Sequence, residues 1–297
     1  MVRVCCPNRK RARFVLTALQ QTKTTLQGGC RTPKKICWLF LAVGAPHCGA
    51  NDLGNTPVRL EEMKEERIVL GELPDLFRLK SGRRVRTKKD WTLRRSELLG
   101  MFQDIEYGRL PPKPRSVRAV ELMRHNVAQY MGAAHRQYKL FYGEVSFVLD
   151  VFIPPSGGQF PVILYGDTCW RYLNHEIANN VLGRGYILAT FNRCEIVSDN
   201  PAEDRSAGLY KVYPGNYGAI AAWAWGYHRC VDFLCGLKEV DAKRIAITGH
   251  SRGGKTTLLA GATDERIALT SVNASGCCGA GSFMWQGKGA ETLSVIL

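Results

Sequence analysis

The clearest pattern along the chain is a run of alternating apolar and polar positions at residues 145–153, which ends at two prolines. Alternation with a period of two predicts a half-buried β-strand. Two further apolar runs follow at 160–166 and 186–191, and β-branched runs lie at 244–248 and 267–272. We expect each of these five runs to form a strand.

Helical spacing of apolar residues separates the predicted strands. Residues 217–235 carry apolar side chains at intervals of three and four, which predicts a long amphipathic helix. Shorter helices are expected at 177–182 and 255–262, and apolar residues at helical spacing also lie at 91–102. Strands that alternate with helices predict an α/β fold, a three-layer sandwich in which helices cover both faces of a mostly parallel sheet.

The segment Gly249-His250-Ser251-Arg252-Gly253 has Gly-x-Ser-x-Gly spacing and lies between a predicted strand and a predicted helix. A serine in that context sits on a sharp turn with its hydroxyl exposed as a nucleophile. Glycine suits both flanks, because a Cβ there would crowd the neighbouring strand or helix. We therefore predict an α/β-hydrolase-type site with Ser251 as its nucleophile.

Two basic residues, Arg252 and Lys255, fall in the first turn of the helix that follows the serine. Cations at a helix N-terminus are unfavourable by roughly 0.3–1 kcal/mol each. Either both side chains point to solvent, or they face a negative or oxygen-rich ligand. In the second case Arg252 would support the oxyanion that forms on an attacked carbonyl, and Lys255 would contact substrate hydroxyls or a carboxylate.

Other residues could complete a binding site for a sugar. The segment Gly166–Trp170 follows a predicted strand, in the position where α/β hydrolases place their second oxyanion loop. Four tryptophans carry aromatic faces on which a sugar ring could stack: Trp170, Trp223, Trp225 and Trp285. Of these, Trp223 is expected to lie in the core.

The base of the expected triad is missing from its usual place. A serine hydroxyl needs a histidine to take its proton and an acid to orient that histidine. In α/β hydrolases both follow the nucleophile along the chain. All 6 histidines here precede Ser251, and few predicted strands follow it. We therefore expect a domain that lacks its C-terminal strands.

Composition excludes several classes of function. The net charge of +15 is uneven, with nine basic residues and no acid in residues 1–35, and nine against the single acid Asp90 in residues 78–95. No zinc-spaced or aromatic-interleaved motif accompanies the charge, so we do not expect nucleic-acid binding. The second basic run is expected to be a solvated face or a surface for acidic polysaccharide. The 11 cysteines include no Cys-x-x-Cys pair, and we expect no metal and no cofactor.

The 297 residues suffice for one large domain, and we divide them into a basic leader at 1–50, an irregular lead-in at 51–115 and an incomplete α/β-hydrolase domain at 116–297. Within the leader, residues 34–50 have two lysines, then apolar residues, then small ones, as in a secretory signal. The alternative is a disordered basic tail. The apolar run is too short to span a bilayer stably, so we expect a secreted or periplasmic protein.

Beyond these patterns, parts of the sequence resemble the glucuronoyl methylesterases, carbohydrate esterases often described in bacteria as acetyl xylan esterases. The segments that carry the resemblance are 217–226, 240–244, 249–255 and 264–266, within a total span of about residues 70–297. The string Gly-x-Ser-Arg-x-Gly-Lys is more specific than Gly-x-Ser-x-Gly alone. The resemblance implies a serine carboxylic ester hydrolase that acts on 4-O-methyl-glucuronoyl esters of glucuronoxylan, on lignin–carbohydrate esters or on acetyl xylan.

By matching positions, the resemblance implies that Ser251 is the nucleophile, that Arg252 binds the oxyanion and that Lys255 contacts the uronate hydroxyls. Fungal members carry their catalytic acid directly before a Ser-Gly pair, where this chain has Ala274. Glu291 is a conceivable alternative acid. The departures leave two other hypotheses open: another serine esterase or peptidase on the same fold, and a polysaccharide-binding relative without catalysis.

Overall fold

The computed structural model describes residues 75–170, 174–200, 205–281 and 291. All of them belong to the unit formed by residues 57–297. The signal-like segment at 34–50 and Trp285 lie outside the described residues. No described helix is both long enough and apolar enough to cross a membrane.

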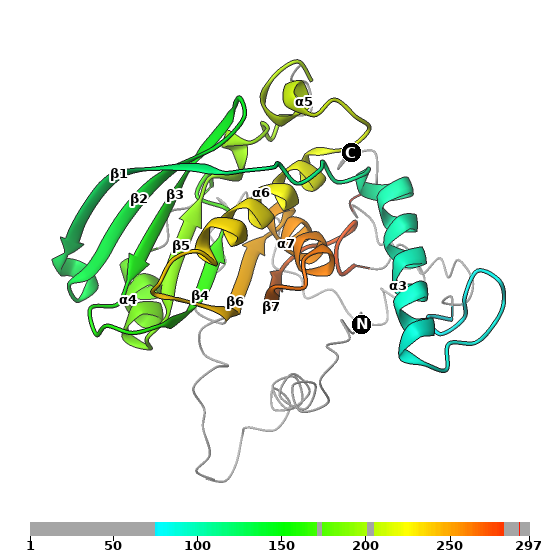
Figure 1. The fold of residues 1–297 in the computed structure, drawn as a ribbon, viewed down its shortest axis with the longest axis horizontal. Coiled ribbons are helices and arrows are strands. Elements are labelled where there is room, and N and C mark those ends of the chain that lie inside the picture. Colours follow the sequence, from blue (N-terminus) through cyan, green and yellow to red (C-terminus); the bar gives the residue numbers. More distant parts are fainter. Residues whose placement is uncertain (1–74, 171–173, 201–204, 282–290, 292–297) are drawn as a thin grey trace, which may run out of the picture. The chain divides into compact units, whose positions relative to one another are not determined.

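A single seven-stranded sheet organises the described chain (Figure 1). Its strands are β1 (Arg118–Val127), β2 (Ala133–Tyr142), β3 (Val145–Ile153), β4 (Phe160–Tyr165), β5 (Ile187–Phe191), β6 (Val240–His250) and β7 (Ile267–Asn273). Its α-helices are α3 (Lys88–Phe102), α4 (His175–Gly183), α5 (Gly208–Val212), α6 (Ala219–Leu234) and α7 (Arg252–Thr263), with short helical turns at Gln103–Tyr107, Ala128–Tyr130 and Arg193–Glu195.

The sheet has a different character in its two halves. The strand order is β1-β2-β3-β5-β4-β6-β7. Three neighbouring pairs are antiparallel: β1 with β2, β2 with β3, and β3 with β5. The other three are parallel: β5 with β4, β4 with β6, and β6 with β7. The expected α/β fold is therefore confirmed, but the sheet is mixed rather than mostly parallel, because β1, β2 and β3 add an antiparallel half. The parallel half contains the strand that leads to Ser251.

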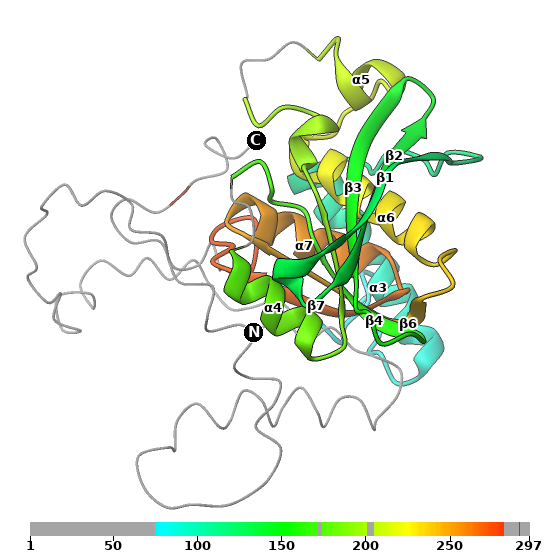
Figure 2. The ribbon, with the colours of Figure 1, turned by 90° about the vertical axis from the view of Figure 1, so that its left-hand side faces the viewer.

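The handedness of the crossovers places the helices on the two faces of the sheet. The connection from β4 to β5, which contains α4, moves the chain towards the β1 edge of the sheet. The connection from β5 to β6, which contains α6, and that from β6 to β7, which contains α7, move it towards the β7 edge. Because such crossovers are right-handed, steps in opposite directions put their helices on opposite faces. Figure 2 shows α4 and α6 on either side of the sheet, and α6 packs against α7.

This arrangement creates a position suited to a site. The connections after β4 and β6, which are neighbours, leave towards opposite faces of the sheet. Ligands of open α/β sheets bind where adjacent connections diverge in this way, at the carboxyl ends of the strands. Ser251 follows the last residue of β6, and the loop that begins at Gly166 follows β4. Both lie at this divergence.

The core confirms the periodicities of the sequence. Alternate residues of β3 are buried, from Val145 to Ile153, and all five residues of β5 are buried. Trp223 and Trp225 on α6 are both almost fully enclosed, so neither can stack on a sugar. The buried apolar residues of the sheet and of α6 form one continuous cluster. Hydrophobic burial against this helix therefore holds the sheet's central strands in place.

Strands β1 and β2 were not predicted, and their pattern explains why. Nine of the ten residues of β1 are exposed and the tenth is half-buried, so this edge strand has no apolar face to alternate with a polar one. Strand β2 is buried at alternate positions only towards its end. The short helix α5 was also not predicted.

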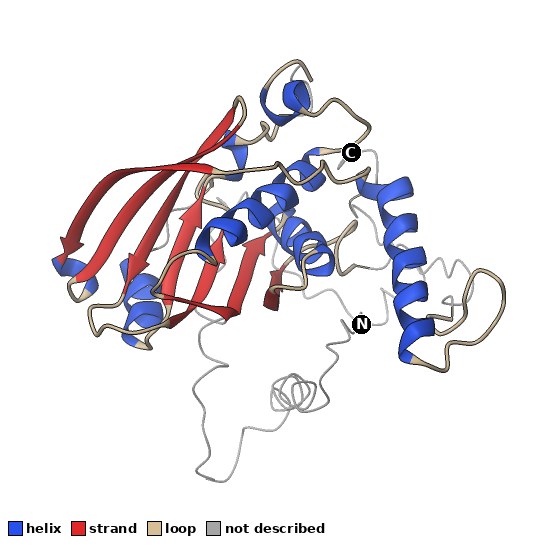
Figure 3. Ribbon diagram, in the orientation of Figure 1, coloured by secondary structure: helices blue, strands red, loops and turns tan. Residues whose placement is uncertain are grey.

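Within the described part of the lead-in, residues 75–115, the longest regular element is helix α3. Helix α3 covers the residues with helical spacing at 91–102 and begins slightly earlier, at Lys88, where Thr87 and Asp90 form reciprocal hydrogen bonds as a capping box. Figure 3 shows α3 apart from the antiparallel half of the sheet, on the side of β7. Arg95 donates a hydrogen bond of 2.6 Å to the carbonyl of Ala262 at the end of α7, which ties α3 to the elbow helix.

Replacing Leu164 in β4 by alanine should lower the free energy of unfolding by about 2–5 kcal/mol, because the side chain is fully buried at the centre of the sheet. The matched control is Leu122→Ala on β1, where the leucine is 50% exposed and the change should stay within about 0.5 kcal/mol. Urea unfolding curves of both variants measure the difference. Equal effects would contradict the burial pattern described for the sheet.

Candidate active site

Ser251 occupies a strained turn between β6 and α7. Its backbone has φ 54° and ψ −119°, a conformation that residues with a side chain rarely adopt. The N–H of Ser251 donates a hydrogen bond of 3.0 Å to the carbonyl of Asn273 on β7, and its carbonyl accepts one of 3.0 Å from the N–H of Lys255. The expected strand–turn–helix context is present, and the strain is held by bonds on both sides of the serine.

The flanking glycines are required by close approach. A Cβ on Gly249 would lie 2.5 Å from the carbonyl oxygen of Gly253, inside van der Waals contact. A Cβ on Gly253 would overlap the carboxylate of Asp167. The turn can therefore close only because both positions lack a side chain, and the second glycine also makes room for a buried acid.

Asp167, the second residue of the loop after β4, connects this loop to the elbow. Its Oδ2 atom accepts a hydrogen bond of 2.7 Å from the backbone N–H of His250. Its Oδ1 atom pairs with the guanidinium of Arg193, which follows β5. Both side chains are at most 3% exposed, and burial raises the pKa of Asp167 while the charge of Arg193 opposes that effect. The loop, β5 and the elbow therefore share one buried ion pair.

Arg252 also has an acidic partner. Its Nη1 atom lies 2.5 Å from Oδ1 of Asp199 and 3.3 Å from the main-chain oxygen of the same residue. The Asp199 carboxylate accepts two further hydrogen bonds, each of 3.2 Å, from Nη2 of Arg193 and from the indole N–H of Trp170. Trp170 is 71% exposed, so its ring remains accessible beside the arginine.

Lys255 is buried, with a side chain only 1% exposed. Its Nζ donates hydrogen bonds of 2.7 Å to the carbonyl of Ser275 and 2.8 Å to the carboxylate of Glu291. The buried Glu106 lies within electrostatic reach; its burial raises its pKa, and the charge of Lys255 opposes that effect. The amino group is thus surrounded by oxygen atoms from several elements.

The two cations of the first helical turn therefore do not point freely to solvent. Each has a carboxylate partner within the chain, Asp199 for Arg252 and Glu291 for Lys255. These acids offset the unfavourable placement of two positive charges at a helix N-terminus. The roles expected for Arg252 and Lys255 towards a substrate stay predictions, as does that of Trp285, which lies outside the described residues.

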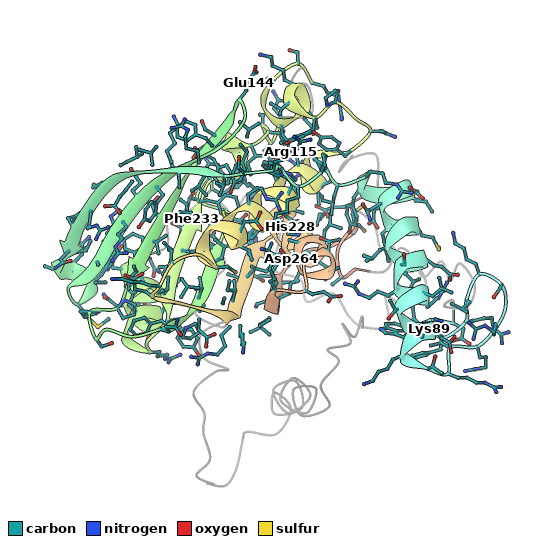
Figure 4. All side chains as sticks on the ribbon, viewed as in Figure 1. Lys89, Arg115, Glu144, His228, Phe233 and Asp264 are labelled. Atoms are coloured by element: carbon teal, nitrogen blue, oxygen red, sulfur yellow. The ribbon has the colours of Figure 1, made fainter. Side chains whose placement is uncertain are left out.

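His228 does not reach Ser251. It lies on α6, and its Nε2 atom is 3.1 Å from the carbonyl of Ala260 and 3.2 Å from the hydroxyl of Thr263 (Figure 4). Those residues belong to the last turns of α7, whereas Ser251 precedes its first residue. With a rise of 1.5 Å per residue, the two ends are about 15 Å apart. Burial lowers the pKa of His228, as expected for a structural imidazole.

The other described histidines also have places apart from the serine hydroxyl. His125 and His135 face each other across β1 and β2, and the ring of His175 lies 5.5 Å from that of Tyr130. His250 is exposed. Within the described residues no hydrogen bond joins the hydroxyl of Ser251 to any histidine, and no group of histidine, cysteine or acidic side chains there could hold a metal ion.

Asp167, Arg193 and Asp199 were not predicted as a linked group. A signal exists in retrospect for the first two, since Asp167 comes directly after the strand predicted at 160–166 and Arg193 comes two residues after the strand predicted at 186–191. Parallel strands end at the same edge of a sheet, so side chains just after them meet there. Asp199 lies in an irregular segment, where no periodicity fixes the direction of its side chain.

The fold and the elbow define an α/β-hydrolase-type protein with a serine in the nucleophile position. The comparisons specify the family. A family model described as "Glucuronyl esterase, fungi" matches residues 137–294. The chain belongs to the glucuronoyl esterase family.

Individual relatives agree with this assignment. The chain is 34% identical over 216 residues to a 4-O-methyl-glucuronoyl methylesterase of Cerrena unicolor, and 32% identical over 236 residues to one of Podospora anserina. These matches cover 70% and 76% of this chain but 43% and 46% of the relatives. The chain thus spans about half the length of the curated relatives it matches.

Solved structures give the same result. A glucuronoyl esterase from Solibacter usitatus matches this chain with a TM-score of 0.62 and 28% sequence identity. The match covers 71% of this chain and 65% of the Solibacter usitatus chain. A carbohydrate esterase family 15 glucuronoyl esterase from Caldicellulosiruptor kristjansonii has a TM-score of 0.60 and 29% identity, covering 75% and 60%. A variant of the Sporotrichum thermophile enzyme, with a TM-score of 0.56, 29% identity and coverage of 70% and 54%, is in complex with methyl 4-O-methyl-β-D-glucopyranuronate.

Replacing Gly253 by alanine should destabilise the protein by about 2 kcal/mol or more, because the added methyl group would displace the Asp167 carboxylate from its buried partners. The control is Gly100→Ala in α3, where a Cβ meets nothing within 4 Å. That change should stabilise the helix by roughly 0.5–1 kcal/mol. Urea unfolding measures both, and a neutral Gly253→Ala would contradict the packing of Asp167 against the elbow.

Of the neighbouring cysteines Cys169 and Cys194, Cys194 should react faster with iodoacetamide near pH 7.5. A hydrogen bond from the thiol of Cys169 and a neighbouring guanidinium lower the pKa of Cys194, which increases its thiolate fraction. The hydrogen bond and burial raise the pKa of Cys169, and burial raises that of Cys230, Cys235 and Cys278. Peptide mass spectrometry after short labelling tests the order, and earlier labelling of Cys169 would contradict it.

Proposed function

We propose that the site around Ser251 is directed at esters of 4-O-methyl-glucuronic acid in glucuronoxylan, and that it is the site of a serine carboxylic ester hydrolase. The observation that carries the proposal is the elbow itself, with Ser251 at positive φ and Arg252 and Lys255 on the turn that follows. The names of the relatives and the uronate ester bound to one of them support the choice of substrate.

In the proposed reaction, the Oγ atom of Ser251 attacks the ester carbonyl carbon, and the carbonyl oxygen becomes an oxyanion. The N–H of Arg252 and its guanidinium would stabilise that charge. The alcohol leaves with a proton, which gives an acyl-enzyme, and water then releases the uronate. Lys255 would donate hydrogen bonds to the sugar hydroxyls, and Trp285 would stack on a sugar ring.

Attack by the serine requires a base that takes its proton. No described histidine is hydrogen-bonded to Ser251, and Ala274 stands where the resemblance predicts a catalytic acid. Glu291 could serve as an acid only in competition with its ion pair to Lys255. We therefore expect the 297-residue chain alone to bind the uronate ester without detectable turnover.

The lack of a histidine bonded to Ser251 among the described residues also favours a second candidate function, that of a polysaccharide-binding protein that keeps the hydrogen-bond donors of the site and does not catalyse. The two candidate functions differ in one respect. If the protein is an esterase, a base placed beside Ser251 would restore ester cleavage, whereas in a binding protein it would not. An extracellular or periplasmic location, expected from residues 34–50, would suit either candidate, because both act on cell-wall polysaccharide. That location and the leader stay predictions.

Binding should be measured by calorimetry with methyl 4-O-methyl-glucuronate as the ligand. Lys255→Met should weaken binding about tenfold or more, because it removes a buried charged donor from the expected contact with the sugar hydroxyls. The control is Lys211→Met, which removes an exposed cation paired with the exposed Glu144 and should leave binding unchanged. Acetylated xylo-oligosaccharides and a peptide ester serve as competing substrate classes.

Three outcomes are informative. Saturable binding that is lost in Lys255→Met and retained in Lys211→Met supports the proposal. Absence of binding to the uronate ester, or a preference for the acetyl or peptide ligand, would overturn the proposed substrate. Release of methanol by the unaltered chain above that of Ser251→Ala would overturn the expectation that the chain alone does not turn over.

A further inference from the structure

Arg252 is held in place by a single acidic residue. Its Nη1 atom contacts Asp199 twice, at Oδ1 (2.5 Å) and at the main-chain oxygen (3.3 Å). The Asp199 side chain is 14% exposed, whereas that of Arg252 is 35% exposed. A guanidinium carries donors on three nitrogens. Among the described residues, Nε and Nη2 of Arg252 have no hydrogen-bond partner, and the side chain is 35% exposed, so a ligand can reach these donors.

The second oxygen of the Asp199 carboxylate, which does not contact Arg252, also accepts hydrogen bonds. This oxygen, Oδ2, accepts from Nη2 of Arg193 and from the indole N–H of Trp170, each at 3.2 Å. Arg193 in turn is only 1% exposed and pairs with Asp167, and its guanidinium lies 4.6 Å from the ring of Trp223. Because the buried Arg193 is held by Asp167, it limits the movement of the Asp199 carboxylate, and Arg252 adapts to the position of Asp199.

Together with the backbone of the elbow, these contacts form a closed path that includes Ser251. Asp167 accepts from the N–H of His250, the residue before Ser251, and Arg252 is the residue after it. The ring therefore runs from the N–H of His250 through the side chains of Asp167, Arg193, Asp199 and Arg252, and we call these the charge ring. Because the ring begins and ends on the elbow, its members can fix a side-chain direction relative to the serine hydroxyl.

We infer that Asp199 is a positioning residue that orients the guanidinium of Arg252, the residue that follows Ser251. A free arginine side chain loses rotamer entropy when it binds a ligand. Holding Nη1 on Asp199 removes much of that cost before a ligand arrives, and preorganised donors stabilise developing charge best. The part played by the oriented guanidinium in ester cleavage rests on the proposed function; its orientation by Asp199 does not.

Two different roles for the Asp199 carboxylate predict different results when it is removed. If Asp199 served only to satisfy the buried Arg193, its loss would affect stability and leave Arg252 unchanged. If Asp199 positions Arg252, its loss should release the Arg252 side chain even in a folded protein. Arg193 keeps its buried partner Asp167 when Asp199 is replaced, and the side-chain oxygen of asparagine still accepts hydrogen bonds, so Asp199→Asn should remain folded.

The test is ¹⁵N NMR of arginine side chains in the full chain, with the Arg252 signals assigned from Arg252→Lys. In the unaltered protein the guanidinium hydrogens on Nη1 should exchange slowly with water. Asp199→Asn should accelerate that exchange about tenfold or more, because it removes a charge-assisted hydrogen bond. Asp199→Glu restores a carboxylate and should recover part of the protection. The control, Asp104→Asn, removes an exposed carboxylate paired with the exposed Arg109 and should change nothing at Arg252.

A milder variant guards against misfolding. Trp170→Phe removes one donor to Asp199 and leaves the carboxylate, so it should accelerate exchange at Arg252 in the same direction and by less. Unchanged exchange in Asp199→Asn, with its fold intact by amide spectra, would overturn the inference; if that variant does not fold, unchanged exchange in Trp170→Phe would do so.

Addition of methyl 4-O-methyl-glucuronate separates this inference from the proposed function. If the ester does not shift the Arg252 signals of the unaltered protein, the proposed substrate is wrong. The hydrogen-exchange rates still test whether Asp199 orients Arg252. If the ester shifts those signals in the unaltered protein and less in Asp199→Asn, the oriented guanidinium meets the ligand.

Discussion

Asp167 and Arg193 form an ion pair in the interior of the protein, at the point where β4 and β5 end. A buried pair is not a strong source of stability, but removal of one partner leaves an unpaired buried charge and costs about 3–5 kcal/mol. The two residues therefore have to stay together, and the surrounding chain adapts to them. Gly253 leaves space for the carboxylate, and the N–H of His250 donates to it. The elbow, the loop after β4 and the charge ring all depend on this pair.

The parts of the fold that follow from local periodicity could be predicted from the sequence. Strand β3 alternates because one of its faces packs against the core, and α6 has an apolar face because it covers the sheet. The Gly-x-Ser-x-Gly spacing predicted the elbow for a steric reason, since both glycines lie in close contact with other atoms. In each case the burial that shapes the element also leaves a repeated mark on its own residues.

The remainder depends on contacts between distant parts of the chain. Strand β1 is exposed along nearly its whole length and forms by pairing with β2, so its own pattern carries no sign of a buried face. Asp199 and Arg252 are 53 residues apart, and only the completed fold brings them together. Sequence patterns revealed which residue types stand beside Ser251 and left open which groups they would meet.

Near Ser251 the charges cancel. Arg193 pairs with Asp167, Arg252 with Asp199 and Lys255 with Glu291, so three positive and three negative side chains balance before any ligand binds. A uronate ester is neutral, whereas the uronate that its cleavage yields is an anion. A site with net positive charge would retain that anion and become inhibited by its own product. Under the proposed function, the balanced pairs would let single donors act on the ester without a net field that holds the product back, and release of the acid into water would be favoured.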